Sequence, residues 1–412
     1  MATANSISDT LNANYKSVYA DDIVELIPDG VKVLNDLKFV EGEKQQGGTY
    51  NQPVAVALEH GFSFGTGEEV INLGAAVAGK LENATVTGFQ MVGRAQWGWT
   101  AAARAVTSKA AFRNVTEVVL TNLMTSHKKK AEAICLYGQS GLGAVASVSG
   151  SDIRLTDATS AEGLWVGAKN MPIEIRDTSG TLITTTKITA VTIASSSPYV
   201  TLTVDSIGST AATNLIYFRG AYGKEHKGIH KILTQSASTL FGITQSDYPD
   251  LWAGTSYAPS SGQLTYQKLV KAAALALPKG GEGRFKVYCH PESWQDVVND
   301  MEAARDHSNY KPSILERGVD NIKFHSVAGI MELVAHTCIW RGYAYGLLQD
   351  RSWKRIGSTD ITNRIPGMQG ADQQFLVLEN TAGIESRTYS DYAVMCDAPA
   401  RSFVVSNITQ SS

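Results

Sequence analysis

The chain has 412 residues and a formal net charge of −3; 43% of its residues are hydrophobic and only 18% are charged. This length predicts two or three domains with ample capacity for a buried core. The absence of a basic excess argues against DNA binding by bulk electrostatics, and a charged share below the usual value of about 25% favours a chain that assembles with others.

The cysteines and the N-terminal sequence indicate a protein that is made and used in water. Cys135, Cys289, Cys338 and Cys396 are widely spaced and form no CxxC, which predicts buried thiols in a reducing compartment rather than a zinc site or a disulfide framework. The first residues lack the basic and apolar regions of a signal peptide. No apolar run reaches the length that spans a bilayer, so we expect no membrane partner.

Residues 1–37 mix polar residues with short apolar groups, and we interpret them as an N-terminal arm. Residues 38–70 follow as a predicted extended hairpin loop. A polar, glycine-terminated stretch at residues 43–48 separates a short apolar run at residues 38–40 from a longer strand-like run at residues 54–58. An isolated two-stranded hairpin is marginally stable in water, so this hairpin needs another surface to lie on.

The next region, residues 71–145, contains the helical pattern that is clearest in the sequence. Its alanine-rich part from Trp97 to Phe112 is predicted to be helical. Asn114 and Glu117 then resemble a capping box, and apolar residues recur on one face as far as Tyr137. A helix over residues 115–137 would be about 34 Å long. The glycine that follows it is a natural C-terminal stop.

Residues 146–233 differ in character. The part from Ser147 to Tyr222 is rich in threonine, serine, valine and isoleucine, and short strand-like runs alternate with turn signals such as the DTSG sequence at 177–180. No helical periodicity interrupts these runs. We interpret the segment as an inserted all-β domain, either a small barrel or a sandwich.

Helices and strands resume in residues 234–383. An apolar helical stripe begins at Tyr266 and ends before Pro278, and an alternating strand at residues 285–289 leads through a proline turn into a helix headed by Trp294. Strand patterns close the chain, at residues 374–378, 385–395 and 403–405. The fold class that these elements predict is α+β.

Sequence patterns for catalysis, metal binding and nucleotide binding are weak. Residues 141–146 satisfy GxGxxA, but they follow a helix, whereas a dinucleotide site needs a preceding strand. His226 and His230 have a helical metal-ligand spacing, but Gly228 weakens a helix there and no HExxH glutamate is present. Lys128 to Lys130 could contact phosphates, although a solvated helix end is the commoner explanation. We expect no enzyme, no metal and no other cofactor.

Several local sequences, in their order, resemble the major capsid proteins of tailed bacteriophages, which share the Hong Kong phage-type capsid fold. The sequence ALEHGFSFGTG after the predicted hairpin strand looks like the extended loop of this family. The sequence AEAICLYGQSGLGAV looks like the end of its spine helix, and GRFKVYCHPESWQDVVND is similar to a strand, turn and helix of its axial domain. IESRTYSDYAVMCDAPARSFVV resembles the C-terminal strands that return to its peripheral domain.

The resemblance implies a division of the chain into six parts. They are an N-terminal arm (1–37), an extended hairpin loop (38–70), a peripheral domain with the spine helix (71–145), an inserted β domain (146–233), an axial domain (234–383) and C-terminal strands that return to the peripheral domain (384–412).

The function that the resemblance implies is self-assembly into hexamers and pentamers of an icosahedral head shell. The shell would be part of the virion, would assemble in the host cytoplasm and would enclose double-stranded DNA through weak, non-specific contacts. A portal, decoration proteins and a separate scaffolding protein are further partners of such shells. The hairpin would cover a neighbouring subunit, and its expected contact residues are Lys44, Tyr50, Val54, Val56, Leu58 and Phe62.

Three other interpretations are possible at the level of sequence, and one of them, a β-rich adhesion or tail protein, is disfavoured by the helical stripes around Leu120 and Trp294. An encapsulin-like nanocompartment would use the same fold around protein cargo. An α/β enzyme of unrecognised chemistry would use the β insertion as a substrate module, although a catalytic constellation is missing. Some capsid proteins of this type also crosslink a hairpin lysine to an asparagine, and no asparagine here can be matched to that role by motif.

Overall fold

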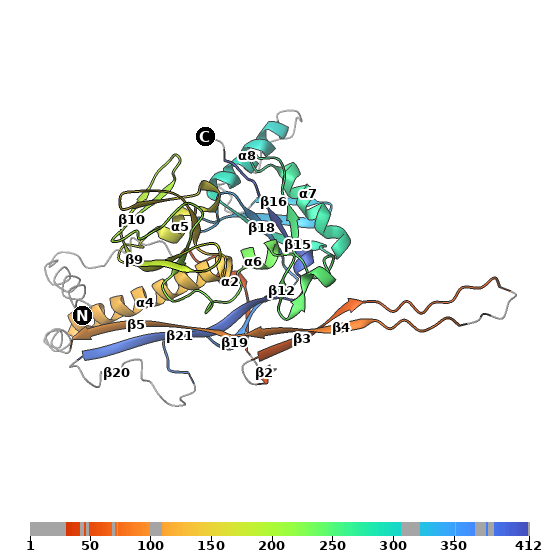
Figure 1. The fold of residues 1–412 in the computed structure, drawn as a ribbon, viewed down its shortest axis with the longest axis horizontal. Helices are drawn as coiled ribbons and strands as arrows, with labels where there is room; N and C mark the ends of the chain where they lie inside the picture. Colours follow the sequence, from red (N-terminus) through yellow and green to blue (C-terminus); the bar gives the residue numbers. More distant parts are fainter. Residues whose placement is uncertain are drawn as a thin grey trace.

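A computed structural model describes residues 30–41, 45–46, 49–67, 71, 73–98, 109–305, 322–350, 352–366, 376–377 and 383–410. Within these ranges the chain forms a long hairpin, a first sheet with a long helix along it, a closed β barrel and a second, larger sheet (Figure 1). The N-terminal arm predicted for residues 1–37 lies outside the described residues up to residue 29.

The first sheet lies along the long helix α4 (Lys109–Tyr137). His127 of α4 is buried against this sheet, and its two ring nitrogens lie 2.9 Å from the hydroxyl groups of Thr388 and Ser390. Burial lowers the pKa of His127 to about 4, so the ring is neutral at pH 7 and binds both hydroxyls without a charge. The strands of the sheet are β1 (Phe39–Glu41), β19 (Trp353–Thr362), β21 (Gly383–Cys396), β20 (Leu376–Val377) and β5 (Phe89–Gly98), which pairs with β21.

The beginning of α4 differs from the prediction, whereas its end agrees. Trp97 belongs to strand β5, and Asn114 lies inside α4, so the predicted helix at Trp97 and the predicted cap at Asn114 are wrong. An Asn-x-x-Glu match within a run of good helix formers does not interrupt a helix that starts at or before Lys109. At the other end Tyr137 is the last helical residue, and the amide of Gly138 donates to the carbonyl of Ile134 at 2.8 Å.

The β insertion is a closed barrel, which confirms the prediction of an all-β module. Trp165 is fully buried among the aliphatic side chains of the barrel, and a short helix, α5 (Glu162–Trp165), carries it. The strands, in order around the barrel, are β10 (Val200–Val204), β7 (Asp152–Leu155), β6 (Gly143–Ser149), β11 (Leu215–Phe218), β8 (Pro172–Arg176) and β9 (Leu182–Ile193).

The second sheet has six strands and mixes parallel with antiparallel pairs. Helix α7 (Tyr266–Ala276) begins at Thr265, whose side chain accepts a hydrogen bond from the amide of Lys268, and α8 (Pro291–Arg305) follows the proline turn as predicted. The strands, in sheet order, are β14 (Thr255–Tyr257), β22 (Phe403–Val405), β18 (Ala344–Leu348), β15 (Gly283–Cys289), β17 (Gly329–Ala335) and β16 (Ile322–Ser326).

The C-terminal strands divide between the two sheets. β21 lies in the first sheet, whereas β22 lies in the second sheet between β14 and β18, so the prediction that all the closing strands return to one domain is wrong for β22. A turn at Pro399 redirects the chain, and Phe403 then packs 5.4 Å from the Phe285 ring in the core of the second sheet. A phenylalanine in an apolar strand fits either core, so the strand pattern could not choose between the sheets.

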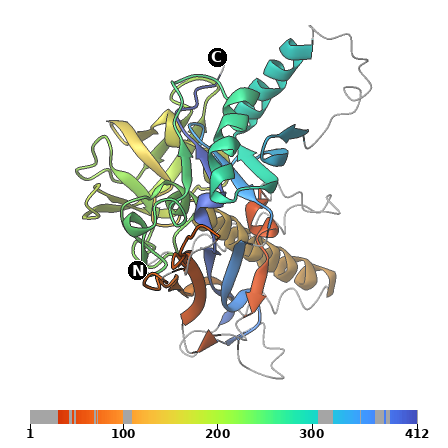
Figure 2. The same cartoon turned by 90° about the vertical axis from the view of Figure 1, so that its right-hand side faces the viewer.

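Short elements connect these parts. A second view shows the barrel on one side and the second sheet, covered by α7 and α8, on the other (Figure 2). None of the described helices is long and apolar enough to cross a membrane. The remaining elements are α2 (Val33–Asp36), β2 (Gln45–Gln46), β3 (Thr49–Ala57), β4 (Lys80–Thr87), α6 (Ile229–Thr234), β12 (Thr239–Leu240), β13 (Ile243–Thr244) and the 3-10 turns Asp157–Thr159, Gln245–Asp247, Leu277–Lys279 and Pro399–Arg401.

Candidate assembly surface

A long hairpin projects from one end of the body (Figure 1). Its two arms are β3 and β4, which pair antiparallel from Thr49 opposite Thr87 to Ala57 opposite Lys80. β4 is followed directly by β5 of the first sheet, so the hairpin continues the longest strands of the body. The chain between residues 58 and 79 extends beyond the paired strands.

The predicted strand pairing of this hairpin is wrong. The run at residues 38–40 does not pair with β3; β1 instead pairs in parallel with β19, with Phe39 opposite Arg355. The partner of β3 is β4, which begins at Lys80, ten residues after the predicted end of the loop at residue 70. A three-residue strand carries too little pattern to reveal a partner three hundred residues away.

The base of the hairpin packs on its own subunit. Tyr50, Ala84 and Val86 are buried in the main core together with Leu240 and Ile243. The amide of Thr85 donates to the carbonyl of Phe241 at 2.7 Å, and the ammonium group of Lys80 lies 5.5 Å from the centre of the Tyr248 ring. These contacts fix the direction in which the hairpin leaves the body.

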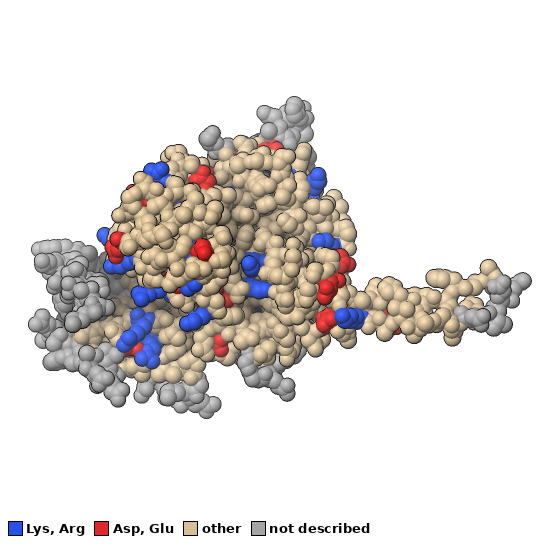
Figure 3. Space-filling model, in the orientation of Figure 1, with Lys and Arg blue, Asp and Glu red and all other residues tan. Residues whose placement is uncertain are grey.

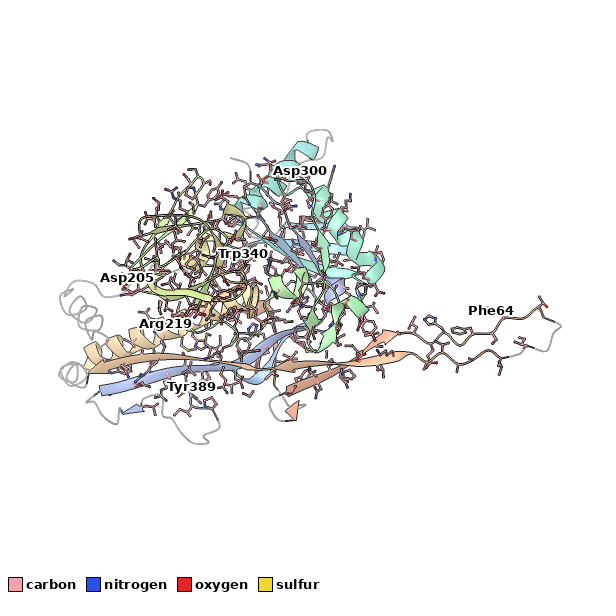
Figure 4. All side chains as sticks on the ribbon, viewed as in Figure 1. Phe64, Asp205, Arg219, Asp300, Trp340 and Tyr389 are labelled. Carbon is pink, nitrogen blue, oxygen red and sulfur yellow. The ribbon has the colours of Figure 1, made fainter. Side chains whose placement is uncertain are left out.

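Beyond the base, large apolar side chains are exposed to water. Leu58, Phe62, Phe64 and Leu73 are 76%, 74%, 94% and 88% exposed. Phe64 lies near the far end of the hairpin, well away from the body (Figure 4). These side chains bury little apolar area within their own chain, and contiguous exposed apolar side chains are typical of protein–protein contact surfaces.

The expected contact residues fall into three groups. Leu58 and Phe62 are on the exposed arm. Tyr50 and Val56 are buried in their own subunit, and Val54 is partly buried against the main core. Lys44 lies outside the described residues. In this subunit, Leu58 and Phe62 are therefore the members of the set that are free to contact a neighbour.

One site of structural importance was missed by the sequence patterns. The buried carboxylate of Glu132 on α4 accepts hydrogen bonds from the backbone amides of Val33 at 2.9 Å and Leu34 at 2.7 Å. The same carboxylate lies 2.8 Å from the Nε2 atom of His336. Helix α2 and the chain before the hairpin are thereby held on the long helix. A glutamate within a helical pattern gives no signal that it is buried.

A second missed group joins the barrel to the second sheet. Arg341 donates from Nε to Glu162 of the barrel at 2.7 Å and from Nη2 to Glu292 of α8 at 2.6 Å. Its guanidinium lies 3.4 Å from the centre of the Tyr199 ring, and His290 Nε2 lies 2.8 Å from Glu162. Burial raises the pKa of Glu162, but the hydrogen bond from His290 and the charges of His290 and Arg341 outweigh it and lower the pKa to about 2. We call these residues the Arg341 cluster.

The side chains considered for chemistry have structural surroundings. His230 lies 2.9 Å from the hydroxyl of Tyr345, and burial lowers its pKa to about 3. Burial also raises the pKa of the four cysteine thiols, which lowers their reactivity. The GxGxxA segment enters strand β6 rather than a helix. Among the described residues, no group of three histidine, cysteine or acidic side chains is placed to hold a metal ion.

The lysines at residues 128–130 of α4 were expected to form a solvated helix end. This expectation is wrong for two of the three. Lys129 donates to the backbone carbonyl of Val166 in the barrel, and the ammonium group of Lys130 lies 5.7 Å from the centre of the Phe218 ring. Lys128 is exposed. Two of the three lysines therefore contact the barrel from the long helix.

No protein-family model matches the sequence, and no curated protein sequence matches it. Solved structures match its fold. A chain of the capsid asymmetric unit of cyanophage A-1(L) aligns with a TM-score of 0.56 and 10% identity over 95% of this chain and 96% of that chain. A chain from the capsid of a native GTA particle aligns with a TM-score of 0.48 and 7% identity over 95% and 94% of the two chains. A chain from the capsid of cyanophage P-SCSP1u aligns with a TM-score of 0.47 and 8% identity over 96% of this chain and 93% of that chain.

The cyanophage A-1(L) alignment spans nearly the full length of both chains, so the likeness concerns the fold as a whole. The α+β class expected from the sequence agrees with it. The chain has the Hong Kong phage-type capsid fold, with a closed β barrel inserted after its long helix.

Proposed function

We propose that this chain is a major capsid protein that assembles into the head shell of a tailed phage. The observation that carries the proposal is the projecting hairpin with its exposed row of Leu58, Phe62 and Phe64. Water contact at this row is unfavourable, and burial of apolar area contributes about 25 cal/mol per Å². Each copy therefore gains by placing its hairpin on another copy.

The geometry favours closed rings of identical subunits. The hairpin leaves one end of the body, so a copy that places it on the body of the next copy uses two different surfaces for the contact (Figure 1). Such head-to-tail contacts are heterologous, and they generate rings when the rotation between copies closes. Hexamers and pentamers are the rings from which an icosahedral shell is built.

The charge of the chain suits a container for double-stranded DNA. The net charge is −3, and Figure 3 shows acidic and basic side chains interspersed over most of one face. Affinity for DNA depends mainly on phosphate neutralisation by lysine and arginine. We propose that the shell encloses its genome through weak contacts, which allows the DNA to leave. Scaffolding, portal and decoration proteins are further proposed partners.

Electron microscopy of the purified protein tests the proposal. The wild-type chain should form regular shells or rings in negative stain. Leu58→Asp with Phe62→Asp should abolish them, while far-UV circular dichroism of the double variant stays like that of the wild type. Leu182→Asp, which places the same charge on an exposed leucine of the barrel, is the matched control and should still assemble.

Two results would contradict the proposal. A wild-type chain that remains a monomer at every concentration in analytical ultracentrifugation is not a shell protein. Unfolding of the double hairpin variant would show that Leu58 and Phe62 serve the fold of their own chain. The nucleic-acid content of particles isolated from the native source separates a genome container from a compartment that holds protein.

A further inference from the structure

The first sheet has one face against α4 and one face turned away from it. A Cβ built on Gly93 of β5 would lie 3.2 Å from the Leu123 side chain and 3.5 Å from His127, so the odd-numbered residues of β5 face the helix. The even-numbered residues lie on the opposite face, because side chains alternate along a strand. Figure 4 shows the labelled Tyr389 of β21 on this opposite face, away from α4. We call it the open face, and its residues are Gln90, Val92, Arg94 and Gln96 of β5 and Glu385, Arg387, Tyr389 and Asp391 of β21.

The pairing of β5 with β21 places two arginines side by side on the open face. Arg94 lies directly opposite Arg387, and their side chains are 55% and 41% exposed. Side chains at opposite positions of an antiparallel pair have Cβ atoms about 5 Å apart, and like charges there are destabilising. The pairing of the two strands therefore gains nothing from a second arginine at this place.

A buried carboxylate beside the pair fixes how the two arginines point. Glu385 is fully buried, and its Oε2 atom accepts a hydrogen bond from Nε of Arg94 at 2.5 Å, while its Oε1 atom accepts one from Nε of Arg387. Gln96, directly opposite Glu385, donates to Oε2 at 2.7 Å. Burial raises the pKa of Glu385, but the hydrogen bonds from Gln96 and the two arginines outweigh burial and lower this pKa to about 2. The carboxylate is therefore charged at neutral pH and holds both guanidinium groups.

Both arginines use Nε for this contact, which leaves the Nη ends of the guanidinium groups for another ligand. Across the part of the chain that the structure describes, Arg94 makes no hydrogen bond through its Nη atoms. Arg387 has one further neighbour, the side chain of Tyr389 two positions along the same strand. Most of the N–H donors of the two guanidinium groups therefore point into water.

The open face has an excess of positive charge around the pair. Glu385 neutralises one of the two arginines and leaves one positive charge. The other acid of the open face, Asp391, lies farther along β21, and its Oδ2 atom accepts a hydrogen bond from Ser358 at 2.6 Å. The cross-strand pair of Val92 and Tyr389 separates it from the arginines. An anion that approaches the pair is therefore attracted.

We propose that Arg94 and Arg387 form a phosphate-binding site, in which the Nη ends of both guanidinium groups converge on one phosphate group. A guanidinium binds phosphate oxygens through parallel N–H donors, and a phosphate has enough oxygen atoms to accept from two such groups at once, whereas one guanidinium satisfies a carboxylate. The site lies on an open sheet face, so the phosphate can belong to a free ion or to the backbone of a nucleic acid. The inference goes beyond the proposed function, because phosphate binding does not depend on shell formation.

Phosphorus NMR of pyrophosphate and fluorescence anisotropy of a short labelled DNA duplex test the site at low salt. The wild-type protein should broaden the pyrophosphate signal, and sodium chloride should reverse the broadening. Arg94→Gln with Arg387→Gln should weaken binding about tenfold, because charge-assisted hydrogen bonds are lost. Arg154→Gln with Lys187→Gln, at exposed positions on the barrel, makes the same change in net charge and should bind like the wild type.

Two further variants separate phosphate binding from support of the fold. The double glutamine variant leaves the charge of Glu385 buried with Gln96 alone, which lowers stability. Adding Glu385→Gln removes this buried charge, so the triple variant should keep the circular dichroism of the wild type and still bind phosphate about tenfold more weakly. Arg94→Lys with Arg387→Lys keeps both charges for Glu385 but replaces each planar donor group with one ammonium group, and it should weaken binding about fivefold.

The outcomes decide the inference without reference to assembly. It is overturned if the wild type binds neither probe, or if the triple variant binds pyrophosphate as tightly as the wild type. A lysine pair with wild-type affinity would show that charge alone attracts phosphate and would also contradict the site. Duplex binding that pyrophosphate displaces supports the site with a nucleic-acid backbone as the source, and binding of pyrophosphate alone supports it with a free phosphate. Microscopy tests shell formation separately, so either proposal can fail while the other stands.

Discussion

Glu132 contributes more to the stability of this fold than a glutamate on a helix usually does. Its carboxylate is fully buried and binds two backbone amides of helix α2 and the ring of His336. Burial of a carboxylate is unfavourable unless hydrogen bonds compensate for the lost water. Here much of the compensation comes from a segment of chain about a hundred residues earlier, so the long helix and the chain before the hairpin stabilise each other.

Glu132→Ala should lower the free energy of unfolding by about 3 kcal/mol, because several buried donors lose their acceptor at once. Urea unfolding of the unassembled subunit measures this change. Lys128→Ala, at an exposed position on the same helix, should change it by less than about 0.5 kcal/mol. Equal effects of the two substitutions would show that the Glu132 hydrogen bonds contribute nothing specific.

Glu225 makes stability depend on pH in a direction that can be worked out. Its pKa is about 7 in the folded chain, above the ordinary value of 4.5, so the folded chain holds the proton more tightly than the unfolded chain. The resulting stability is fully present below about pH 4.5 and is lost as the pH rises through 7. The free energy of unfolding falls by about 3 kcal/mol at most over this pH range.

Glu225→Gln should remove this pH dependence, because glutamine keeps an oxygen acceptor for the amide of Gln139 without a titrating proton. The melting temperature of the variant relative to the wild type should therefore rise between pH 5 and pH 8. Thermal unfolding at four pH values in that range measures the difference. A difference that is constant with pH would mean that burial of Glu225 has no such effect.

At the scale of elements, sequence patterns were reliable where one local signal was long. The apolar stripe before Tyr137, the strand at residues 285–289 and the threonine-rich run of the barrel all gave the correct type of element. The same patterns failed to predict where elements begin and which strands pair with each other. Trp97 is in a strand because β21 pairs with it, opposite Ile384, and that pairing depends on residues almost three hundred positions away.

The connection of the barrel to the second sheet could not be predicted for the same reason. Glu162, Glu292 and Arg341 are distant in sequence, and each is an ordinary charged residue in its own segment. Only the fold places them together, where the Arg341 guanidinium donates to both carboxylates. A backbone hydrogen bond from the amide of Gly163 to the carbonyl of Thr337, at 3.0 Å, lies beside them.

Arg341→Met should loosen the barrel from the second sheet while the barrel remains folded. The substitution removes the guanidinium from the Tyr199 ring and leaves the Glu162 carboxylate with its contact to His290. The free energy that holds the barrel on the second sheet should fall by about 3 kcal/mol. Hydrogen exchange should become faster at the backbone contacts of residues 158–163, whereas the barrel strands should stay protected.

The matched control for this prediction is Arg154→Met, an exposed arginine on barrel strand β7. It should leave exchange at residues 158–163 unchanged. Faster exchange throughout the barrel strands of the Arg341 variant would instead show that the cluster stabilises the barrel itself rather than its connection.

For the whole molecule, the useful asymmetry is that the hairpin projects from one end of the body (Figure 1). The exposed leucines and phenylalanines of the hairpin could be found from the sequence because they follow a strand pattern. The body surface where α4, β5, β21 and the chain leaving the barrel meet could not, because these elements are separated in the sequence by up to three hundred residues. The lysine and arginine side chains that line this surface, Lys130, Arg219 and Lys224, cannot be recognised as a group in a chain whose net charge is −3.

A chain without the tip tests whether the contact between copies is head-to-tail. Gly61 and Ala76 lie next to each other across the hairpin, with 3.2 Å from a Cβ built on Gly61 to the Cα of Ala76, so a short turn can replace residues 62–75. The shortened chain should fold as before and form no shells. It keeps the body of the subunit, so in a head-to-tail contact it can still accept a hairpin from a wild-type copy, but it offers none to the next.

In mixtures, the shortened chain should therefore stop growing rings and inhibit assembly well beyond its share of the protein. If one chain in six is shortened, most six-membered rings contain at least one interruption, and light scattering should fall much more than the loss of one sixth of the subunits would cause. An isologous contact, in which both copies use the same surface, predicts a smaller fall in light scattering. Because both partners would then need the tip, shortened chains would stay out of the particles, and scattering would fall only in proportion to the wild-type chain that remains.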